Sequence, residues 1–384
     1  MEQTISATVS ELPSYGRLPL DVVGAEGDEL ILGDGRRLLD LYGGHCVNLL
    51  GAGDAQLGSL LHAQWKKLSF ATNLLPLEGR AAYAAALAQT LPPGQWQYFL
   101  SNSGAEANEN AIKLALDATG RDTILCFSGA FHGRTSGAAA LNDGLETGFP
   151  LAPYRVRRVA WGDKEAALKA IDSAVAGVIL EPIQSMAGVV TPPPQFLEAL
   201  RGACNTAGAV LIFDEVQSGS GRLGSAWGST HFGVIPDVFS SAKGVGGGFP
   251  MGLTVVSQAT AQQVNPKLFG STFGGGPMAL CAATEVARRI QSAGFLETVR
   301  SRSRAFRELC QTGPVEHVRG AGLLLGLELQ KGFSASQVRD QLLDARILVG
   351  TSADPQVLRI SPPLTVSESA PLRLAQALES IATD

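Results

Sequence analysis

Asp214 and Lys243 are the two residues whose surroundings first suggest chemistry. Asp214 directly follows an apolar run, AVLIF (209–213), and Lys243 stands among small residues in SSAKGVGGG. A buried carboxylate is costly unless a cation or a hydrogen-bond donor compensates its charge. A lysine partly removed from water has a lowered pKa and becomes a nucleophilic amine suited to a Schiff base. The pair predicts a site that combines a fixed negative charge with a reactive amine.

Both residues also have other interpretations. A single lysine is most often a solvated surface residue, and Asp214 could face a metal ion instead of a protonated pyridine nitrogen. No cluster of His or Cys stands near Asp214 in the sequence, which disfavours the metal. The run GVGGG after Lys243 is similar to a dinucleotide-binding fingerprint, but FPMG follows it where a long helix is required. A nicotinamide oxidoreductase is therefore the least favoured function.

The segment SNSGAEANENAIKLAL (101–116) predicts a strand end, a turn of small residues and the start of a helix. Free N–H groups at a helix start bind anions, and small residues allow a phosphate to come close. The alternative is an ordinary helix cap, in which Ser103 serves Glu106. On its own, this segment favours the cap.

Two more segments place functional side chains after apolar runs. In FSGAFHGRT (127–135), a flat ring could lie against Phe131 or His132, and Arg134 offers a bidentate fork for a carboxylate. The alternative is a core phenylalanine and a solvated arginine. In EPIQ (181–184), Glu181 is an acid at the end of an apolar run, as Asp214 is.

The elements that would position these residues alternate between short apolar runs and helical stretches from about residue 55 to 270. This pattern predicts βαβ units and a mainly parallel sheet. In open sheets of this kind the ligand lies at the carboxyl ends of the strands. The predicted strands are 97–100, 123–127, 177–180 and 210–213, and the predicted helices include 80–90 and 106–119.

The two ends of the chain predict a second, smaller α+β unit. Residues 29–41 read as a hairpin around Gly33-Asp34-Gly35, and the C-terminal part predicts helices at 278–293 and 371–383 with strands at 322–329 and 357–360. We therefore expect an N-terminal segment (1–50) joining the small domain, a large domain (51–275) and a C-terminal small domain (276–384).

The overall composition fits a protein with a large buried core. Of 384 residues, 45% are hydrophobic and 17% charged, and the net charge is −5 without a basic stripe, so nucleic-acid and anionic-membrane partners are not expected. Five scattered cysteines without CxxC spacing predict free thiols rather than a disulfide framework or a zinc site. Neither a signal peptide nor a membrane-spanning run is visible, so we expect a cytoplasmic protein.

Taken in order, these segments resemble the fold-type I, class III pyridoxal-phosphate (PLP) aminotransferases, most of all the acetylornithine and ornithine aminotransferase subgroup. The resemblance covers nearly the whole chain. It is carried by SNSGAEANENAIKLA, FHGRT, EPIQ, LIFDEVQSGSGRLG, DVFSSAKGVGGGFPMG, GSTFGGGPMA, RGAGLLLGLEL and LRISPPL.

The resemblance implies a role for each candidate residue. Lys243 bonds covalently to the cofactor, and Asp214 pairs with its pyridine nitrogen. Arg134 and Arg359 bind substrate carboxylates, with Glu181 nearby. The remaining cofactor contacts it implies are Ser103, Gly104 and Ala105 at the phosphate, Phe131 and His132 at the ring, Gln217 at the 3-oxygen, and Ser271 and Thr272 at the phosphate of the neighbouring subunit in a homodimer.

The implied reaction is ping-pong transfer of an ω-amino group, from an acetylornithine-, ornithine- or lysine-type donor, to an oxo acid such as 2-oxoglutarate. The alternatives are a 4-aminobutyrate-type aminotransferase, an aminomutase, a racemase or a decarboxylase on the same cofactor, or a non-catalytic protein that kept the fold. One departure affects the substrate site. The family often has Gly-Glu after EPIQ, where the glutamate pairs with the arginine matching Arg359, but this chain has Ser185-Met186. Either another acid serves Arg359, or the donor always brings a carboxylate to it.

Overall fold

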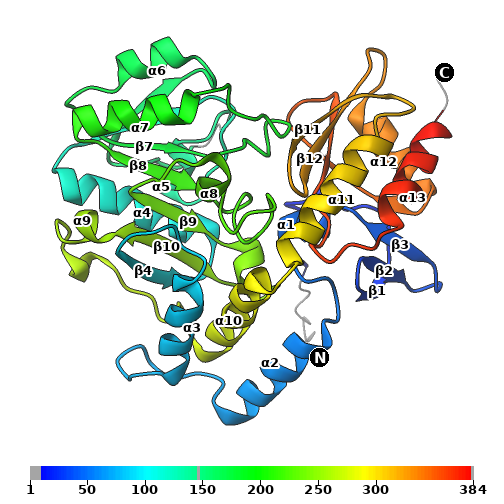
Figure 1. Cartoon of the computed structure of the whole chain (residues 1–384), viewed down its shortest axis with the longest axis horizontal. Coiled ribbons are helices and arrows are strands. Elements are labelled where there is room, and N and C mark those ends of the chain that lie inside the picture. The colour runs from blue at the N-terminus through cyan, green and yellow to red at the C-terminus, as the bar shows by residue number, and fades with distance from the viewer. Residues whose placement is uncertain (1–9, 145–147, 382–384) are drawn as a thin grey trace, which may run out of the picture.

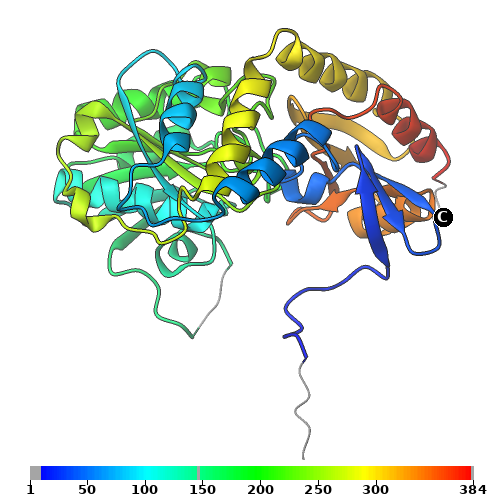
Figure 2. The ribbon, with the colours of Figure 1, turned by 90° about the horizontal axis from the view of Figure 1, so that it is seen from below.

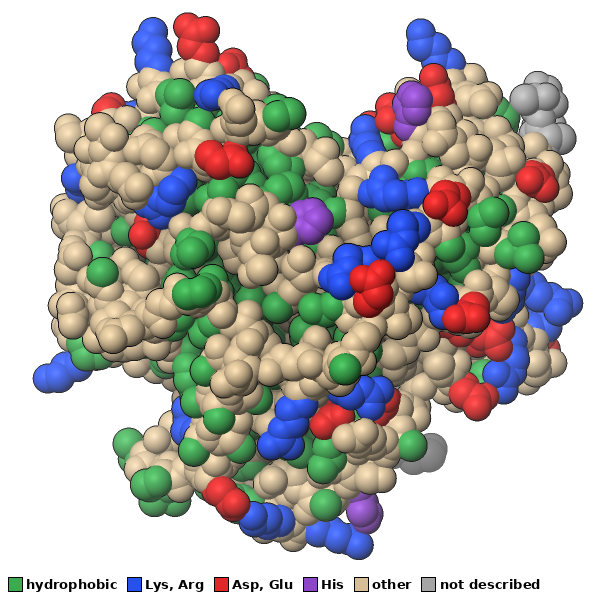
Figure 3. All heavy atoms as spheres, viewed as in Figure 1, with side chains coloured by type: hydrophobic (Ala, Val, Ile, Leu, Met, Phe, Trp, Pro, Cys, Tyr) green, Lys and Arg blue, Asp and Glu red, His purple; other side chains and the backbone are tan. Residues whose placement is uncertain are grey.

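A computed structural model describes residues 10–144 and 148–381 of the chain. Figure 1 shows a larger lobe built around a stack of strands and a smaller lobe that contains both the first strands and the last helices. Figure 3 shows the same two lobes as spheres, with a notch between them at the upper edge and with charges of both signs spread over this face. Within the described ranges, no helix is both long enough and apolar enough to cross a bilayer.

The larger lobe contains a seven-stranded sheet with the order β4-β10-β9-β8-β7-β5-β6. Only β10 runs antiparallel to its neighbours β4 and β9, so the prediction of a mainly parallel sheet is confirmed. The strands are β4 (Trp96–Ser101), β5 (Thr123–Phe127), β6 (Arg155–Val159), β7 (Val175–Leu180), β8 (Val210–Asp214), β9 (Val238–Ser241) and β10 (Gly252–Ser257).

Helices cover both faces of this sheet because its central strands are apolar on both sides. In β8, Leu211 and Phe213 pack on one face with α3, α7 and α10, whereas Val210 and Ile212 pack on the other face with α4. The helices of this lobe are α2 (Ala55–Lys67), α3 (Glu78–Ala88), α4 (Gly104–Thr119), α5 (Ser136–Ala140), α6 (Lys164–Ala170), α7 (Phe196–Ala207), α8 (Gly228–Phe232), α9 (Gln258–Ala261) and α10 (Pro277–Gln291), with 3-10 turns at Lys243–Gly246 and Pro266–Leu268.

The smaller lobe joins the two ends of the chain. Its strands form the sheets β1-β2-β3-β13 and β11-β12-β15-β14, and β3 pairs in parallel with β13 from the C-terminal part. The predicted hairpin at 29–41 is confirmed as the antiparallel pair β2–β3. The elements are β1 (Val22–Glu26), β2 (Glu29–Leu32), β3 (Arg37–Asp40), α1 (Gly43–Cys46), α11 (Phe295–Leu309), β11 (Val315–Ala321), β12 (Leu324–Leu329), α12 (Ala335–Asp344), β13 (Ile347–Leu348), β14 (Gly350–Thr351), β15 (Val357–Ile360) and α13 (Ala370–Glu379).

One apolar core unites these N- and C-terminal elements. Leu39 of β3 belongs to the same buried cluster as Phe306 of α11, Leu327 of β12 and Leu374 of α13. Figure 2 shows α11 and α13 crossing one side of the small lobe, and residues 10–20 leaving it as an arm without helix. We propose the division expected from the sequence, 1–50, 51–275 and 276–384, because it separates the sheets of the two lobes; residues 1–9 and 382–384 lie outside the described part. Helix α10 spans this boundary, since Leu280 packs in the core of the larger lobe and Ile290 in that of the smaller lobe.

Candidate active site

A cavity of about 440 Å³ opens at the carboxyl ends of β4, β5, β7, β8 and β9. Its position agrees with the rule that open α/β sheets bind ligands at that edge. Ten of the thirteen predicted site residues line it, together with Asn108 and Val216. These ten are Ser103, Gly104, Ala105, Phe131, His132, Arg134, Glu181, Asp214, Gln217 and Lys243.

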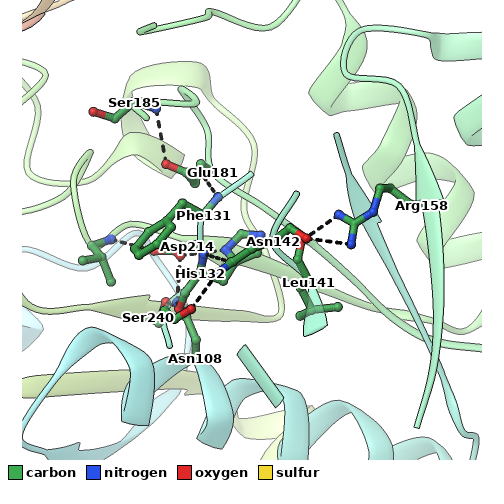
Figure 4. Close-up of polar contacts among 12 residues, drawn as sticks. Asn108, Phe131, His132, Leu141, Asn142, Arg158, Glu181, Ser185, Asp214 and Ser240 are labelled. Atoms are coloured by element: carbon green, nitrogen blue, oxygen red, sulfur yellow. Dashed lines mark hydrogen bonds and ion pairs between the residues drawn. The ribbon is translucent and has the colours of Figure 1, made fainter. Parts of the chain in front are cut away.

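Asp214, the last residue of β8, is buried and held by three hydrogen bonds. Its Oδ2 atom accepts from Nδ2 of Asn108 at 2.7 Å and lies 2.8 Å from Nδ1 of His132, and its Oδ1 accepts from the backbone N–H of Val216 at 3.0 Å. Figure 4 shows the side chains of Asn108 and His132 converging on Asp214. The carboxylate is therefore fixed, and Oδ1 keeps room to accept from a protonated group in the cavity.

Lys243 reaches the cavity from the turn after β9. Its backbone has φ +47°, a left-handed conformation that is rare for a side chain larger than glycine and often marks a functional position. Burial lowers the pKa of the Lys243 amine and Arg359 adds to the effect, whereas Cys46, Asp214 and Glu181 oppose it. A lowered pKa increases the fraction of Lys243 that is unprotonated, which is the nucleophilic form of the amine.

Glu181 lies at the end of β7, next to the aromatic side of the cavity. Its Oε1 accepts from the N–H of Phe131 at 3.0 Å and its Oε2 from the N–H of Ser185 at 3.3 Å. Burial raises the pKa of Glu181, and the nearby charge of Asp214 raises it further. Figure 4 shows Glu181 between Phe131 and Ser185.

Arg134 is exposed at the rim of the cavity, where it stays free to meet a ligand from solvent. Its guanidinium carbon lies 5.3 Å from the centre of the Phe131 ring, which is the distance of a cation–π contact. Phe131 is thus a cavity wall rather than a core side chain.

The segment at 101–116 forms the helix cap that was one of its two interpretations, and the anion site stays a prediction beside it. Ser103 caps α4, since its Oγ accepts from the N–H of Glu106 at 3.2 Å. The N–H groups of Gly104 and Ala105 belong to the first turn, where no intrahelical acceptor is in reach, and both residues line the cavity. The same helix start therefore offers an anion site at the positive end of a 16-residue helix dipole.

Three predicted residues lie outside the cavity lining. Ser271 and Thr272 belong to the loop before α10, where Oγ of Ser271 accepts from Nδ2 of Asn102 at 3.3 Å and from the N–H of Gly274 at 2.9 Å. Arg359, on β15, is buried and contacts Ser185, which in turn donates to Oε1 of the cavity residue Gln217 at 3.0 Å.

Two further polar residues near the site differ from the sequence predictions: Glu215 follows β8 but does not line the cavity, and Asn108 contacts Asp214 although it was not predicted. Glu215 turns away from the cavity and accepts from the N–H groups of Gly228 and Ser229. Asn108, which the sequence interpretation missed, holds Asp214; its place one helical turn after Gly104 was the available signal. In the described part of the chain, no group of three or more His, Cys, Asp or Glu side chains is placed to hold a metal ion.

The family model "Aminotransferase class-III" matches residues 12–382, so the chain belongs to the class III aminotransferases. It is 41% identical over 361 residues to an acetylornithine aminotransferase of Streptomyces coelicolor, an alignment that covers 92% of this chain and 89% of the relative. It is 38% identical to an acetylornithine aminotransferase of Methanopyrus kandleri, covering 96% and 95%.

Solved structures show the same architecture. The N-acetylornithine aminotransferase of Stenotrophomonas maltophilia superposes with a TM-score of 0.82 at 29% identity, covering 95% of this chain and 96% of that one. The ornithine aminotransferase of Toxoplasma gondii superposes with a TM-score of 0.88 at 23% identity, covering 96% and 92%, and supports the fold alone. The chain is a fold-type I, PLP-dependent transaminase.

The cavity fits the cofactor on two observations. Asp214 retains accepting capacity toward the cavity, as a protonated ring nitrogen requires. At the helix start, backbone and small side chains pack so closely that a Cβ added at Gly133, whose φ is +131°, would lie 2.6 Å from Cβ of Ala105. The glycine at 133 therefore lets the loop after β5 pack directly on the first turn of α4, next to the N–H groups of Gly104 and Ala105 that line the cavity.

Proposed function

We propose that this transaminase moves the amino group of an ω-amino acid of the acetylornithine, ornithine or lysine type to 2-oxoglutarate by a ping-pong mechanism. The observation that carries the proposal is that Asp214, Lys243 and Arg134 line one cavity. Asp214 and Lys243 are what PLP chemistry on an amine requires, and an arginine at the rim suits a substrate that brings a carboxylate.

Bound PLP supplies an aldehyde that bonds to an amine and a protonated ring that withdraws electrons from the neighbouring carbon. In this proposal Lys243 is the amine that would hold the cofactor, and during turnover its free amine would take and return a proton as general base and acid. Asp214 would keep the ring nitrogen protonated, Gln217 would contact the 3-oxygen, and Phe131 and His132 would lie against the ring.

The phosphate would be held at Ser103, Gly104 and Ala105, with Ser271 and Thr272 completing the site of the neighbouring subunit in a homodimer. Large apolar side chains beside that loop are exposed in the single chain: Leu74 is 90% exposed and Phe273 66%. The ring of Phe273 also packs on Phe70, 5.3 Å between centres. Exposed apolar groups next to the loop support a subunit contact there.

The surrounding charges support a substrate with two carboxylates. The pKa of His45 is lowered to about 4. Burial is the largest cause, and the nearby cations Arg359, Lys243 and Arg134 lower the pKa further. Arg134 and Arg359 come from opposite lobes, so one substrate could meet both. The names of the relatives support the ornithine-type donor. The five cysteines, all free, support a cytoplasmic location.

A half-reaction screen tests this function. Purified holoenzyme is mixed with acetylornithine, ornithine, lysine, 4-aminobutyrate or glutamate, one at a time, while the yellow absorbance of the Lys243-bound cofactor is followed. We expect an ornithine-type donor to bleach the band and 2-oxoglutarate to restore it. Bleaching by 4-aminobutyrate alone would select that aminotransferase class instead, and a yellow protein that no donor bleaches would favour an aminomutase, racemase or decarboxylase.

A further inference from the structure

The side-chain amide of Gln217 has two orientations with opposite chemistry. Gln217 lines the cavity and is 7% exposed. The amide oxygen only accepts hydrogen bonds, whereas the amide nitrogen only donates them. Because the two ends have nearly the same shape, the hydrogen bonds around the amide decide which end faces a ligand.

Arg359 sets the direction of the hydrogen bond that reaches Gln217. The guanidinium donates to Oγ of Ser185 at 3.1 Å, to Oη of Tyr42 at 2.9 Å and to the backbone oxygen of Thr351 at 2.7 Å. A guanidinium has no accepting atom, so the oxygen of Ser185 must accept from it. The one hydroxyl proton of Ser185 is then left to donate to Oε1 of Gln217, 3.0 Å away.

Cys46 donates to the same amide oxygen from the smaller lobe. Its Sγ lies 3.7 Å from Oε1 of Gln217, and a thiol is a weak donor. Cys46 is 4% exposed and packs against Ile183 and Leu324. Since Ser185 is fully buried as well, water competes little with either hydrogen bond. Both donors therefore hold the amide with its oxygen turned away from the cavity.

The nitrogen of the Gln217 amide is left without a partner. Two donors hold Oε1, but within residues 10–144 and 148–381 no group accepts a hydrogen bond from Nε2. Nε2 also keeps some exposed surface. Since Gln217 lines the cavity, this N–H group is available to donate to a ligand there.

The connection between Arg359 and Gln217 depends on the hydroxyl of Ser185. The family often has glycine directly after EPIQ, and glycine has no side chain that could link the two residues. In this chain a buried guanidinium polarises the hydroxyl, and a polarised hydroxyl donates more strongly to the next acceptor. The charge of Arg359 thus favours one orientation of the amide.

We propose that Ser185, with a smaller contribution from Cys46, is a positioning residue that turns Nε2 of Gln217 toward the 3-oxygen of PLP. This inference rests on the contact between Gln217 and that oxygen in the proposed function. An N–H donor stabilises the 3-oxygen in its ionised form, whereas an amide oxygen in the same place would favour the protonated form.

The colour of the holoenzyme reports which form is present. The cofactor bound to Lys243 is yellow when its 3-oxygen is ionised and the proton lies on the Lys243 nitrogen. It absorbs in the near ultraviolet when the 3-oxygen keeps the proton. The ratio of the two bands therefore measures how strongly Gln217 donates to the 3-oxygen, without any turnover.

The first test compares this ratio in wild type, Ser185→Ala and Ser220→Ala, each saturated with PLP and free of substrate. Ser220 is the matched control, because it is 3% exposed, does not line the cavity, and has a hydroxyl without a partner in the described part of the chain. We expect Ser185→Ala to lower the ratio of yellow to near-ultraviolet absorbance about threefold or more, the size of one net hydrogen bond. Cys46→Ala should lower it less. An unchanged ratio in Ser185→Ala would overturn the inference.

A double-mutant cycle shows whether Ser185 acts through Gln217. Gln217→Ala removes the amide, so adding Ser185→Ala to it should change the ratio no further. An equal change in both backgrounds would overturn the inference, since Ser185 would then act by another route. Ser185→Gly, which introduces the residue often found in the family, should lower the ratio as Ser185→Ala does, so the test does not depend on one variant folding.

These measurements need neither an amino donor nor an oxo acid, so their outcome is independent of the half-reaction screen. If no donor bleaches the protein, the proposed function fails, and the band ratios of the same variants still decide the role of Ser185. If the enzyme transfers amino groups and Ser185→Ala keeps the wild-type ratio, this inference alone fails.

Discussion

The Nδ1 atom of His132 lies 2.8 Å from Oδ2 of Asp214, and both side chains are buried at the floor of the cavity. The imidazole of His132 and the amide of Asn108 together fix Oδ2 of Asp214. The N–H of Val216 binds the other oxygen, Oδ1, which keeps capacity to accept a hydrogen bond from the cavity. The arrangement keeps a negative charge where the ring nitrogen of PLP is expected, which is the electrostatic condition for withdrawing electrons from the reacting carbon.

Asp214→Asn should therefore remove most of the activity. The amide keeps the shape of the side chain but cannot stabilise a proton on the ring nitrogen, so we expect kcat/KM to fall by about two to four orders of magnitude. Steady-state kinetics with the donor found in the half-reaction screen check this. Glu215→Gln is the control, because Glu215 is equally buried but does not line the cavity. Loss of less than about threefold in Asp214→Asn would contradict the role given to it.

Glu215 itself should make stability depend on pH. Burial raises its pKa from 4.5 to about 7, although the N–H groups of Ser229 and Gly228 oppose the shift. A carboxyl group with a raised pKa in the folded state stabilises the fold fully below its unfolded pKa and loses that contribution as pH rises through the folded pKa. Between pH 4.5 and about 7, the free energy of unfolding of the wild type should thus fall relative to that of Glu215→Gln.

Urea unfolding of the apoenzyme at several pH values across this window measures the difference between the two proteins. A constant difference between wild type and Glu215→Gln would show that Glu215 is ionised throughout. Since the comparison is a difference, the titration of Lys243, Glu181 and the surface carboxylates cancels to first order.

The shared site of the proposed homodimer can be tested by mixing subunits. Lys243→Ala should be folded but inactive, and Thr272→Glu should be inactive because its charge repels the phosphate of the neighbouring site. When the two are unfolded together and refolded in equal amounts, half of the dimers are mixed and each mixed dimer has one intact site. About a quarter of wild-type activity should return. No recovery, with dimers present by light scattering, would place Thr272 and Lys243 in the same site of one chain.

Much of the fold was predictable because the central strands are continuous apolar runs between helices. Strands β5 and β15 were predicted to the residue, and the helix start at Gly104 lies within two residues of the expected position. Strands β1, β6, β9, β10 and β11, and the two-residue strands β13 and β14, were missed. β6 reads RVRRV on the edge of the sheet and has no apolar run, and a two-residue strand has too short a pattern to recognise.

Most cavity residues could be predicted for the same reason, since they follow predicted strands at the edge where ligands bind. Lys243 is the exception: it follows β9, which was missed, and its setting among small residues was the signal. The surroundings of Arg359 could not be predicted. Tyr42 and Ser185 lie 317 and 174 positions away from it in the chain, and only the pairing of both lobes brings them together. The sequence did show that the expected acid was replaced by Ser185-Met186, but it could not show that a hydroxyl would take the contact.

The most direct test of the central claim is to locate the covalent bond to the cofactor. Purified holoenzyme is reduced with sodium borohydride, digested with trypsin, and analysed by tandem mass spectrometry. The account predicts a phosphopyridoxyl group on Lys243 and loss of this modification, with loss of the yellow band, in Lys243→Ala. A phosphopyridoxyl group on another lysine, or a wild-type protein that takes up no PLP, would contradict the assignment of the cavity as a transaminase active site.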